Sequence, residues 1–412
     1  CGYEASCRGR ANGGKRIYLG TIAYMDQIVQ AEVQTQPARP VESKGRAPVP
    51  LAEDLDRVLA AAQDHVLTKG LGILTVDHHK GRMGLCFQLR LEGGHRDLER
   101  FRNPRLPYEC MICVSGGRDS SYVLWKMVHD YKMRALAVTY KSPFLSKQAQ
   151  ANVELAVKTL GVDHIYWEYP EGAHLNTTKK HLKIWAKKPT STMIPFVCAH
   201  CKSWNFEFYR IAKKHRIPLI IFGSNPLETA SFKKAGLGGA QTYGKLSNLP
   251  NILKRSLKEL LPIPSYLRAN WRIVLKMYLG ASHNTPFMRL RNRGVDVIRM
   301  VDYLRWDEKT IETTISDKLD WRKAPEVESS WRFDCRLDYI RRKMYCSVIG
   351  VTELRDLFSK MIREGMLSRD EAMERLKRVD RVSRAVIDDV LDSLDLKLAD
   401  LNIKLDDTLL TE

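Results

Sequence analysis

A pair of glycines flanked by hydroxyl and charged side chains follows an apolar run in the first third of the chain. The stretch reads Ser115-Gly116-Gly117-Arg118-Asp119-Ser120-Ser121. Glycines let a backbone approach an anion closely and adopt positive φ, so successive N–H groups can point at phosphate oxygens. A helix that begins here would turn its positive end toward the same anion. The spacing therefore predicts a cradle for a pyrophosphate group.

Asp119 is the unexpected member of this stretch, because a carboxylate beside a phosphate is repelled unless a divalent cation lies between them. Mg²⁺ binds in this way, through one or two carboxylates and the phosphates of a substrate. The spacing does not match the Walker loop or the dinucleotide fingerprint, which need GxxxxGK[ST] and GxGxxG. We therefore expect Mg²⁺ with a nucleotide held by a different kind of loop.

The elements that must position this loop are short β-rich runs separated by helical stretches. Such alternation favours a parallel sheet covered by helices on both faces, an α/β fold in which ligands lie at the carboxyl ends of the strands. The predicted strands are residues 109–114, 134–140, 164–169 and 218–223, with a further strand at 295–300.

The loop sequence resembles the PP-loop of the N-type ATP pyrophosphatases, which cleave ATP between the α and β phosphates. The resemblance implies an adenine nucleotide alpha hydrolase-like core, with Arg118 in place of the commoner lysine. It implies catalytic roles for Asp119, Arg118 and Ser115. It also implies that ATP is bound by the loop, by the end of the second strand and by a later Gly-rich strand end. These positions are Ser115, Gly116, Gly117, Asp119, Ser120, Ser121, Thr139, Tyr140, Gly223 and Ser224.

Four further strings resemble the N-acetyl sugar amidotransferase family of this superfamily. The resemblance implies adenylation of the acetamido oxygen of a nucleotide- or lipid-linked N-acetyl sugar, followed by its replacement with ammonia. The product would be an acetamidino sugar for a surface polysaccharide such as lipopolysaccharide. Separate glutaminase and barrel subunits would supply the ammonia. The strings are ALAVTY with QAQANVELAVKTLGVDHI, then CAHC, SSWRFDC and MIREGMLSRDEAMERL.

Two other classes of function stay open at this stage. A tRNA-modifying thiolase of the same superfamily would use Cys198 and Cys201 to carry sulfur. A non-catalytic binding module built on a degenerate loop is the third reading, although Asp119 and both loop glycines are present.

The cysteines suggest a metal site rather than a disulfide scaffold, because nine cysteines are few for a chain of 412 residues. Cys198 and Cys201 have the two-residue gap that lets two thiolates reach one metal. We expect Cys335 and Cys346 to complete a structural Zn²⁺ site, with packed or redox-active cysteines as the alternatives. Cys110 and Cys113 have the same gap on a predicted strand, where they would point to opposite faces.

The charge of the chain is strongly positive, with 67 Lys and Arg against 48 Asp and Glu, a formal net charge of +19. Such a balance attracts polyanions. Residues 226–294 carry twelve Lys and Arg against Glu228 and Glu259. This basic segment suits a sugar diphosphate, a peripheral contact with a membrane or, less well, RNA. With no apolar run long enough for a spanning helix, we expect a cytoplasmic protein, at the inner face of the membrane if this segment binds lipid.

The pattern along the chain predicts five parts. Residues 1–50 are an irregular segment and linker, and residues 51–105 are a small cap with a helix and a hairpin. The ATP-binding core covers 106–225 and the basic insertion 226–294. The last strand and a helical region fill 295–412, where residues 382–401 form an amphipathic segment expected to pack in a core.

Overall fold

The computed structural model describes residues 98–191, 193–228, 272, 275, 276, 279, 286–304, 306–325, 329–379, 382–401, 403 and 410–411. The chain divides into two compact units, Cys1–Asp97 and Leu98–Glu412, and every described residue belongs to the second. The predicted segment 1–50, nearly all of the predicted cap and most of the basic insertion lie outside the described residues. The unit boundary also differs from the predicted one at 105/106, because Leu98 and Phe101 are buried in the core beneath the sheet.

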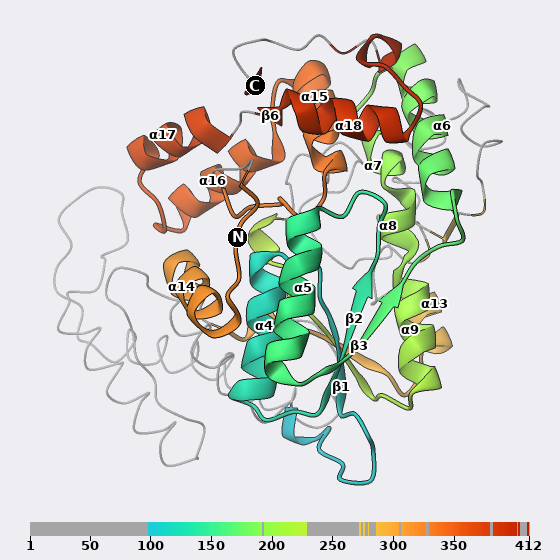
Figure 1. Ribbon diagram of the computed structural model, residues 1–412, viewed down its shortest axis with the longest axis vertical. Coiled ribbons are helices and arrows are strands. Elements are labelled where there is room, and N and C mark those ends of the chain that lie inside the picture. The colour runs from blue at the N-terminus through green and yellow to red at the C-terminus, as the bar shows by residue number, and fades with distance from the viewer. Residues whose placement is uncertain are drawn as a thin grey trace, which may run out of the picture. The chain divides into compact units, whose positions relative to one another are not determined.

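Within the described residues, five parallel strands form one sheet in the order β3-β2-β1-β4-β5 (Figure 1). Each predicted strand is present, with its ends shifted by a residue or two. The α/β class with a parallel sheet is thereby confirmed. The strands are β1 (Cys110–Cys113), β2 (Ala135–Tyr140), β3 (Asp163–Trp167), β4 (Leu219–Phe222) and β5 (Asp296–Arg299).

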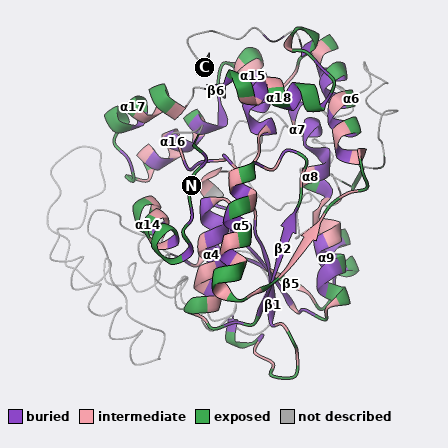
Figure 2. Cartoon of the chain, in the orientation of Figure 1, coloured by how far each residue is buried: buried purple, intermediate pink, exposed green. Residues whose placement is uncertain are grey.

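The central strands are apolar on both sides because helices cover both faces of the sheet (Figure 2). Alternate residues of β1 show this: Cys110 and Ile112 belong to one core cluster, and Met111 and Cys113 to the other. The prediction that Cys110 and Cys113 face opposite sides of a strand is therefore confirmed.

Helices α4, α5 and α14 pack on the first face, and α9 and α13 contribute to the core on the second. Ser146 caps α5 by accepting a hydrogen bond from the N–H of Ala149 (3.1 Å), and Asp307 caps α14 in the same way from Thr310 (2.8 Å). The bounds are α4 (Arg118–His129), α5 (Lys147–Leu160), α9 (Asn205–Lys214), α13 (Pro286–Arg291) and α14 (Glu308–Leu319).

A further core cluster, separate from the two that cover the sheet, is built by helices that follow β3 and by helices near the end of the chain. Ile387, Val390 and Leu391 of the predicted amphipathic segment are buried in it, as expected for core packing. The helices are α6 (Ala173–Lys187), α7 (Ile194–Val197), α8 (Ala199–Ser203), α15 (Leu337–Ile349) and α18 (Arg384–Ser393).

The pair α16 (Glu353–Arg363) and α17 (Arg369–Val379) forms a smaller cluster around Trp331. Ser368 accepts a hydrogen bond from the N–H of Glu371 (3.1 Å) at the start of α17. Short elements complete the description: η2 (Pro226–Glu228), η4 (Met300–Asp302), η5 (Leu398–Leu401), β6 (Val382–Ser383) and β7 (Leu410–Thr411). None of the helices in the described ranges is long and apolar enough to cross a bilayer.

Candidate nucleotide site

The loop between β1 and α4 lies at the centre of the carboxyl edge of the sheet. Strand β1, which leads into this loop, pairs with β2 on one side and with β4 on the other. The chain leaves β1 toward β2 and reaches β4 later, so the order reverses at this point. In open parallel sheets such a reversal is where ligands bind.

Gly116 is required by its conformation and by its neighbours. Its φ is +77°, and a Cβ at this position would lie 1.9 Å from the carbonyl oxygen of Ala149 in α5. Its own carbonyl accepts hydrogen bonds from Asn152 Nδ2 (3.1 Å) and Trp321 Nε1 (2.9 Å). The peptide between Gly116 and Gly117 is planar and trans, so its C=O and N–H point in opposite directions. Because the carbonyl points toward Asn152 and Trp321, the N–H of Gly117 points toward the interior of the loop.

Gly223 leaves room on the opposite side of the loop. It follows β4, and a Cβ there would lie 2.7 Å from the Cα of Ser120 and 3.0 Å from the carbonyl oxygen of Asp119. The backbone after β4 therefore touches the first turn of α4. Ser224 is exposed beyond it, while Asn225 is buried with no hydrogen-bond partner for its Nδ2 among the described residues.

Hydrogen bonds of Ser115 and Ser120 hold the loop in shape, and the hydroxyl of Ser121 has no partner among the described residues. Ser120 Oγ accepts from the N–H of Ser115 (3.1 Å) and donates to the carbonyl of Gly117 (3.1 Å). Gly117 is the N-cap of α4, and no side chain caps the helix there. Ser121 is fully buried, and its Oγ has no hydrogen-bond partner in the described part of the chain. The first turn of α4 thus keeps its donors for a ligand.

Arg118, for which the resemblance implies a catalytic role, has its charge engaged within the protein. Its guanidinium is buried between two indole rings, 4.1 Å from Trp331 and 5.0 Å from Trp306. Nε donates to Asp119 Oδ1 (2.9 Å), and Nη1 donates to Glu308 (2.9 Å) and to Ser330 (2.8 Å). Arg118 therefore fixes the carboxylate of Asp119 and ties the loop to later parts of the chain.

Asp119 is buried and has one oxygen engaged and one left over. Oδ1 accepts from Arg118 and from Trp306 Nε1 (3.2 Å). Oδ2 has no hydrogen-bond partner among the described residues. A buried carboxylate oxygen without a partner is costly in a fold that contains no ligand. It is the atom that fits the predicted Mg²⁺.

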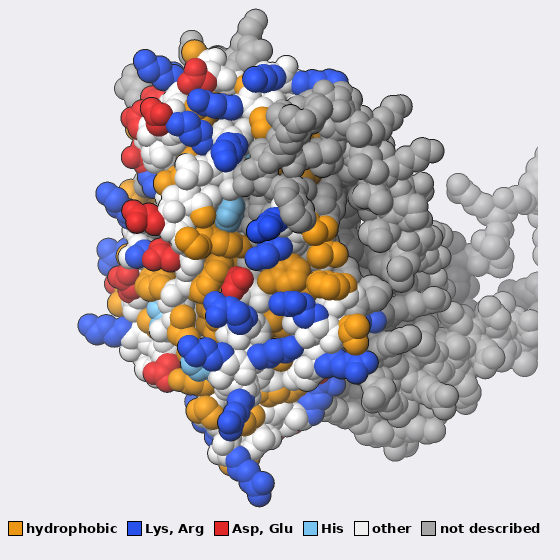
Figure 3. All heavy atoms as spheres, turned by 90° about the vertical axis from the view of Figure 1, so that its right-hand side faces the viewer, with side chains coloured by type: hydrophobic (Ala, Val, Ile, Leu, Met, Phe, Trp, Pro, Cys, Tyr) orange, Lys and Arg blue, Asp and Glu red, His pale blue; other side chains and the backbone are white. Residues whose placement is uncertain are grey.

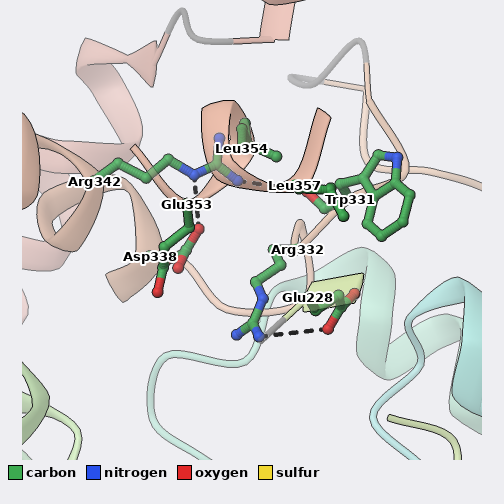
Figure 4. A pocket seen from close by; sticks show the side chains of 8 residues that line it. All are labelled: Glu228, Trp331, Arg332, Asp338, Arg342, Glu353, Leu354 and Leu357. Atoms are coloured by element: carbon green, nitrogen blue, oxygen red, sulfur yellow. Dashed lines mark hydrogen bonds and ion pairs between the residues drawn. The ribbon is translucent and has the colours of Figure 1, made fainter. Parts of the chain in front are cut away.

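Residues 329–335, which we call the crossing segment, bring a second group of side chains to the loop. Ser330 and Trp331 contact Arg118 as described, and Arg332 Nη2 lies 3.4 Å from Glu228 Oε2 (Figure 4). The Oδ2 atom of Asp334 is 3.6 Å from the position of a Cβ on Gly117. The backbone of the segment pairs with the loop after β2: Ser146 donates to the carbonyl of Asp334 (3.0 Å).

The carboxylates beside the loop are held in an unusual state. The pKa of Glu228 is raised to about 7, mainly by burial and also by the charges of Asp119 and Asp334, against the opposing effect of Arg332. Burial also raises the pKa of Asp334. Such crowding of acids is typical of a site that handles cations or protons. Sequence reasoning missed both residues as site members, although Asp334 lies in the string SSWRFDC that it singled out.

Thr139 and Tyr140 lie at the end of β2, but their side chains have partners within the protein. Thr139 is fully buried, with Oγ1 2.9 Å from His164 Nε2. Tyr140 is buried, with its hydroxyl 2.6 Å from His174 Nδ1. What the strand end can offer to a nucleotide is therefore its backbone.

Three of the four predicted zinc ligands lie in one thiol cluster, which we define as Cys198, Cys201 and Cys335. Burial, and then the charge of Cys198, raise the pKa of Cys201 and Cys335, and the pKa of Cys335 reaches about 12. Arg341 Nη1 donates to Cys198 Sγ (3.6 Å). Cys346, half-buried near the end of α15, is the fourth predicted ligand.

Within the described residues, no group of three or more His, Cys, Asp or Glu side chains is placed to hold a metal ion. The zinc site therefore stays a prediction. Asp119 is not affected by this finding, because Mg²⁺ takes much of its coordination from phosphates and water.

No protein-family model and no curated protein matches the chain. Among solved structures, the chain is similar to the NMN synthetase from Francisella tularensis, at 12% identity and a TM-score of 0.33, over 76% of this chain and 97% of that one. It is also similar to the U34-tRNA thiolase NcsA from Methanococcus maripaludis with its 4Fe-4S cluster, at 11% identity and a TM-score of 0.33, over 77% and 84%. Similarity at this level says nothing about the reaction of this chain.

The fold and the site together define an α/β protein with an anion cradle at the switch point of its sheet. The cradle combines Gly116 with its positive φ and the start of α4, which no side chain caps. It also contains the buried carboxylate of Asp119, whose Oδ2 has no hydrogen-bond partner among the described residues. An arrangement of this kind can hold a polyphosphate with its counter-cation.

Proposed function

We propose that the protein is an ATP-dependent, pyrophosphate-forming amidotransferase of the PP-loop superfamily that acts on an N-acetyl sugar. The observation that carries the proposal is the contact between the loop and the crossing segment. SSWRFDC is one of the strings that resemble the sugar amidotransferase family, and its residues contact Arg118 and approach Gly117. The part of the chain that is typical of the family thus forms one wall of the nucleotide site.

The residues present suit a metal-bound triphosphate. Asp119 Oδ2 would contact Mg²⁺, which neutralises phosphate charge when bound. The N–H groups of the first turn of α4 would hold the β and γ phosphates, beside the N–H of Gly117, which donates to Ser115 Oγ (3.3 Å). These groups favour pyrophosphate as the leaving group, because they stabilise the charge that develops on it.

In the proposed reaction, the acetamido oxygen bonds to the α phosphorus as the bond to the β-phosphate oxygen breaks and pyrophosphate leaves. Ammonia then adds to the activated carbon, and the C–O bond breaks so that AMP departs with the oxygen. Ammonium must first lose a proton, and Glu228 and Asp334 stand beside the loop to accept it. Positioning and charge stabilisation supply the rest, without a nucleophilic side chain.

A tRNA-modifying thiolase is the second candidate, and one observation favours it. Cys335 of the thiol cluster directly follows Asp334, so thiols are brought close to the proposed nucleotide site. The raised pKa values of Cys201 and Cys335 argue against it, because sulfur transfer needs a thiolate at neutral pH. We therefore rank it second.

The test is to find which acceptor stimulates AMP formation by the purified chain. With labelled ATP and Mg²⁺, we expect AMP and pyrophosphate when a nucleotide-linked N-acetyl sugar and an ammonium salt are both present, with the rate rising as pH rises toward the ammonium pKa. We expect no use of glutamine unless separate glutaminase and barrel subunits are added. ADP and orthophosphate as products would overturn the superfamily assignment. Stimulation by tRNA with sulfide, but not by sugar, would establish the thiolase instead.

A further inference from the structure

Helices α9 and α13 lie side by side and form one face of the molecule, which we call the α9–α13 face. Lys213 Nζ donates to the carbonyl of Arg291 (2.6 Å), and the rings of Phe206 and Phe287 are 6.3 Å apart. Figure 3 shows this side, with Lys and Arg side chains gathered among exposed hydrophobic ones. The face is distinct from the nucleotide site, which lies at the carboxyl edge of the sheet.

The charged side chains of the α9–α13 face are mostly cationic. Its two acids already have basic partners: Glu207 accepts from Arg210 (2.7 Å), and Asp296 accepts from Arg100 (3.1 Å). The face therefore attracts an anionic surface. Its exposed cations include Arg210, Lys213, Lys214, Arg289, Arg291 and Arg293.

Large apolar side chains stand among these cations. Leu290 is 64% exposed and Phe287 is 43% exposed, while Met288 between them is fully buried in the core. Leu275, in the described part of the basic segment, is 47% exposed. Met288 therefore anchors α13 in the core, while Phe287 and Leu290 are exposed to solvent. Cations beside outward apolar side chains are what an interfacial membrane contact requires.

We propose that the α9–α13 face docks on an anionic lipid surface. Phe287 and Leu290 enter the headgroup boundary, while Lys and Arg side chains contact lipid phosphates. RNA fits less well, because Leu290 and Leu275 have no π face on which a base could stack. The inference does not depend on the proposed reaction.

The experiment measures cosedimentation of the full chain with vesicles of phosphatidylcholine alone and of phosphatidylcholine mixed with phosphatidylglycerol. We expect binding to the mixed vesicles that weakens as salt is raised. Each unit of positive charge lost near an anionic surface should weaken binding about five-fold. Lys214→Glu and Arg293→Glu each change the charge by about two units, so together they should weaken binding by more than about a hundred-fold. Leu290→Ser should weaken it by about three-fold or more, because it removes the inserted side chain.

Matched controls lie on α17, away from this face. Met373 is 53% exposed, and the side chain of Lys377 is 73% exposed, so Met373→Ser and Lys377→Glu make similar surface changes there. Both should leave vesicle binding unchanged. The proposal is overturned if mixed vesicles are not bound, or if the α17 variants weaken binding as much as the α9–α13 variants do. It is also overturned if single-stranded RNA, but not the vesicles, is bound through Lys214 and Arg293. Urea unfolding of each variant, followed by circular dichroism, shows separately that the chain has folded.

Discussion

Asp119 and Asp338 are both buried carboxylates beside arginines, yet their surroundings differ in one respect. Asp338, in α15, has both oxygens engaged: Oδ1 accepts from Arg341, and Oδ2 accepts from Arg342 Nε (2.7 Å). Asp119 has Oδ1 engaged and no hydrogen-bond partner for Oδ2 among the described residues. Both oxygens of Asp338 are bonded to guanidinium groups, which is how a fold holds a structural charge. An oxygen left over at a helix start is how a fold keeps a place for a ligand.

The largest effect that would test this comparison is on activity. Asp119→Asn keeps the shape of the side chain but removes the negative charge that Mg²⁺ requires. We expect AMP formation to fall by about a thousand-fold or more while the chain stays folded, because Glu308 still accepts from Arg118 (2.9 Å). Rates from labelled ATP and a urea titration measure the two.

The control for Asp119 is Asp130, at the other end of α4, where it pairs with Lys126. Asp130→Asn should retain activity. Nearly normal activity of Asp119→Asn would show that the free oxygen is not a ligand position, and the distinction between the two aspartates would fail.

The next effect is on stability and concerns the other aspartate. Asp338→Asn leaves the buried Arg341 and Arg342 without their shared carboxylate, although Glu353 still accepts from Arg341 (2.6 Å). Breaking a buried pair in this way costs about 3–5 kcal/mol in the free energy of unfolding. Urea unfolding at neutral pH measures the loss.

Asp388→Asn is the matched control for Asp338, because its ion pair with Arg384 (2.7 Å) is about half exposed. It should cost less than about 1 kcal/mol. Equal losses in the two variants would show that the guanidinium groups around Asp338 are not essential to the fold.

The smallest expected effect is a dependence on pH. Arginine neighbours lower the pKa of Asp338 from 3.8 to about 2 against the effect of burial. A lowered pKa stabilises the folded state above the unfolded value, and the stabilisation is lost as pH falls through the folded value. Protonated Asp338 resembles asparagine. The stability difference between the wild type and Asp338→Asn should therefore shrink by about 2 kcal/mol between pH 5 and pH 2.

Urea midpoints of both proteins across this range measure the change. A difference that stays constant with pH would mean that the pKa of Asp338 is the same in the folded and unfolded chains, so that the arginines do not favour its charged form. Asp338 would then not be a carboxylate stabilised by ion pairs, and its comparison with Asp119 would fail.

The sequence sufficed for the sheet and for the loop, because both depend on local patterns. Apolar runs predicted all five strands within a residue or two, and two adjacent glycines predicted the turn between β1 and α4. Glu228 and Asp334 were missed because their role depends on how distant segments come together. Arg118 was given a catalytic role from its position in the string, and its place between Trp306 and Trp331 could not be read from that position. Local spacing carries no information about such packing.

The contact between Arg118 and Ser330 joins residues 212 positions apart. At about 5–20 residues per second, the ribosome would add the crossing segment about 10–40 seconds after the loop. During that interval the nascent chain holds an anion cradle whose arginine lacks its two indole neighbours, and whose aspartate lacks the N–H of Trp306. The proposed nucleotide site is therefore completed late in synthesis, and a chain that stops short of Ser330 contains the loop without the side chains of Ser330 and Trp331 that contact Arg118.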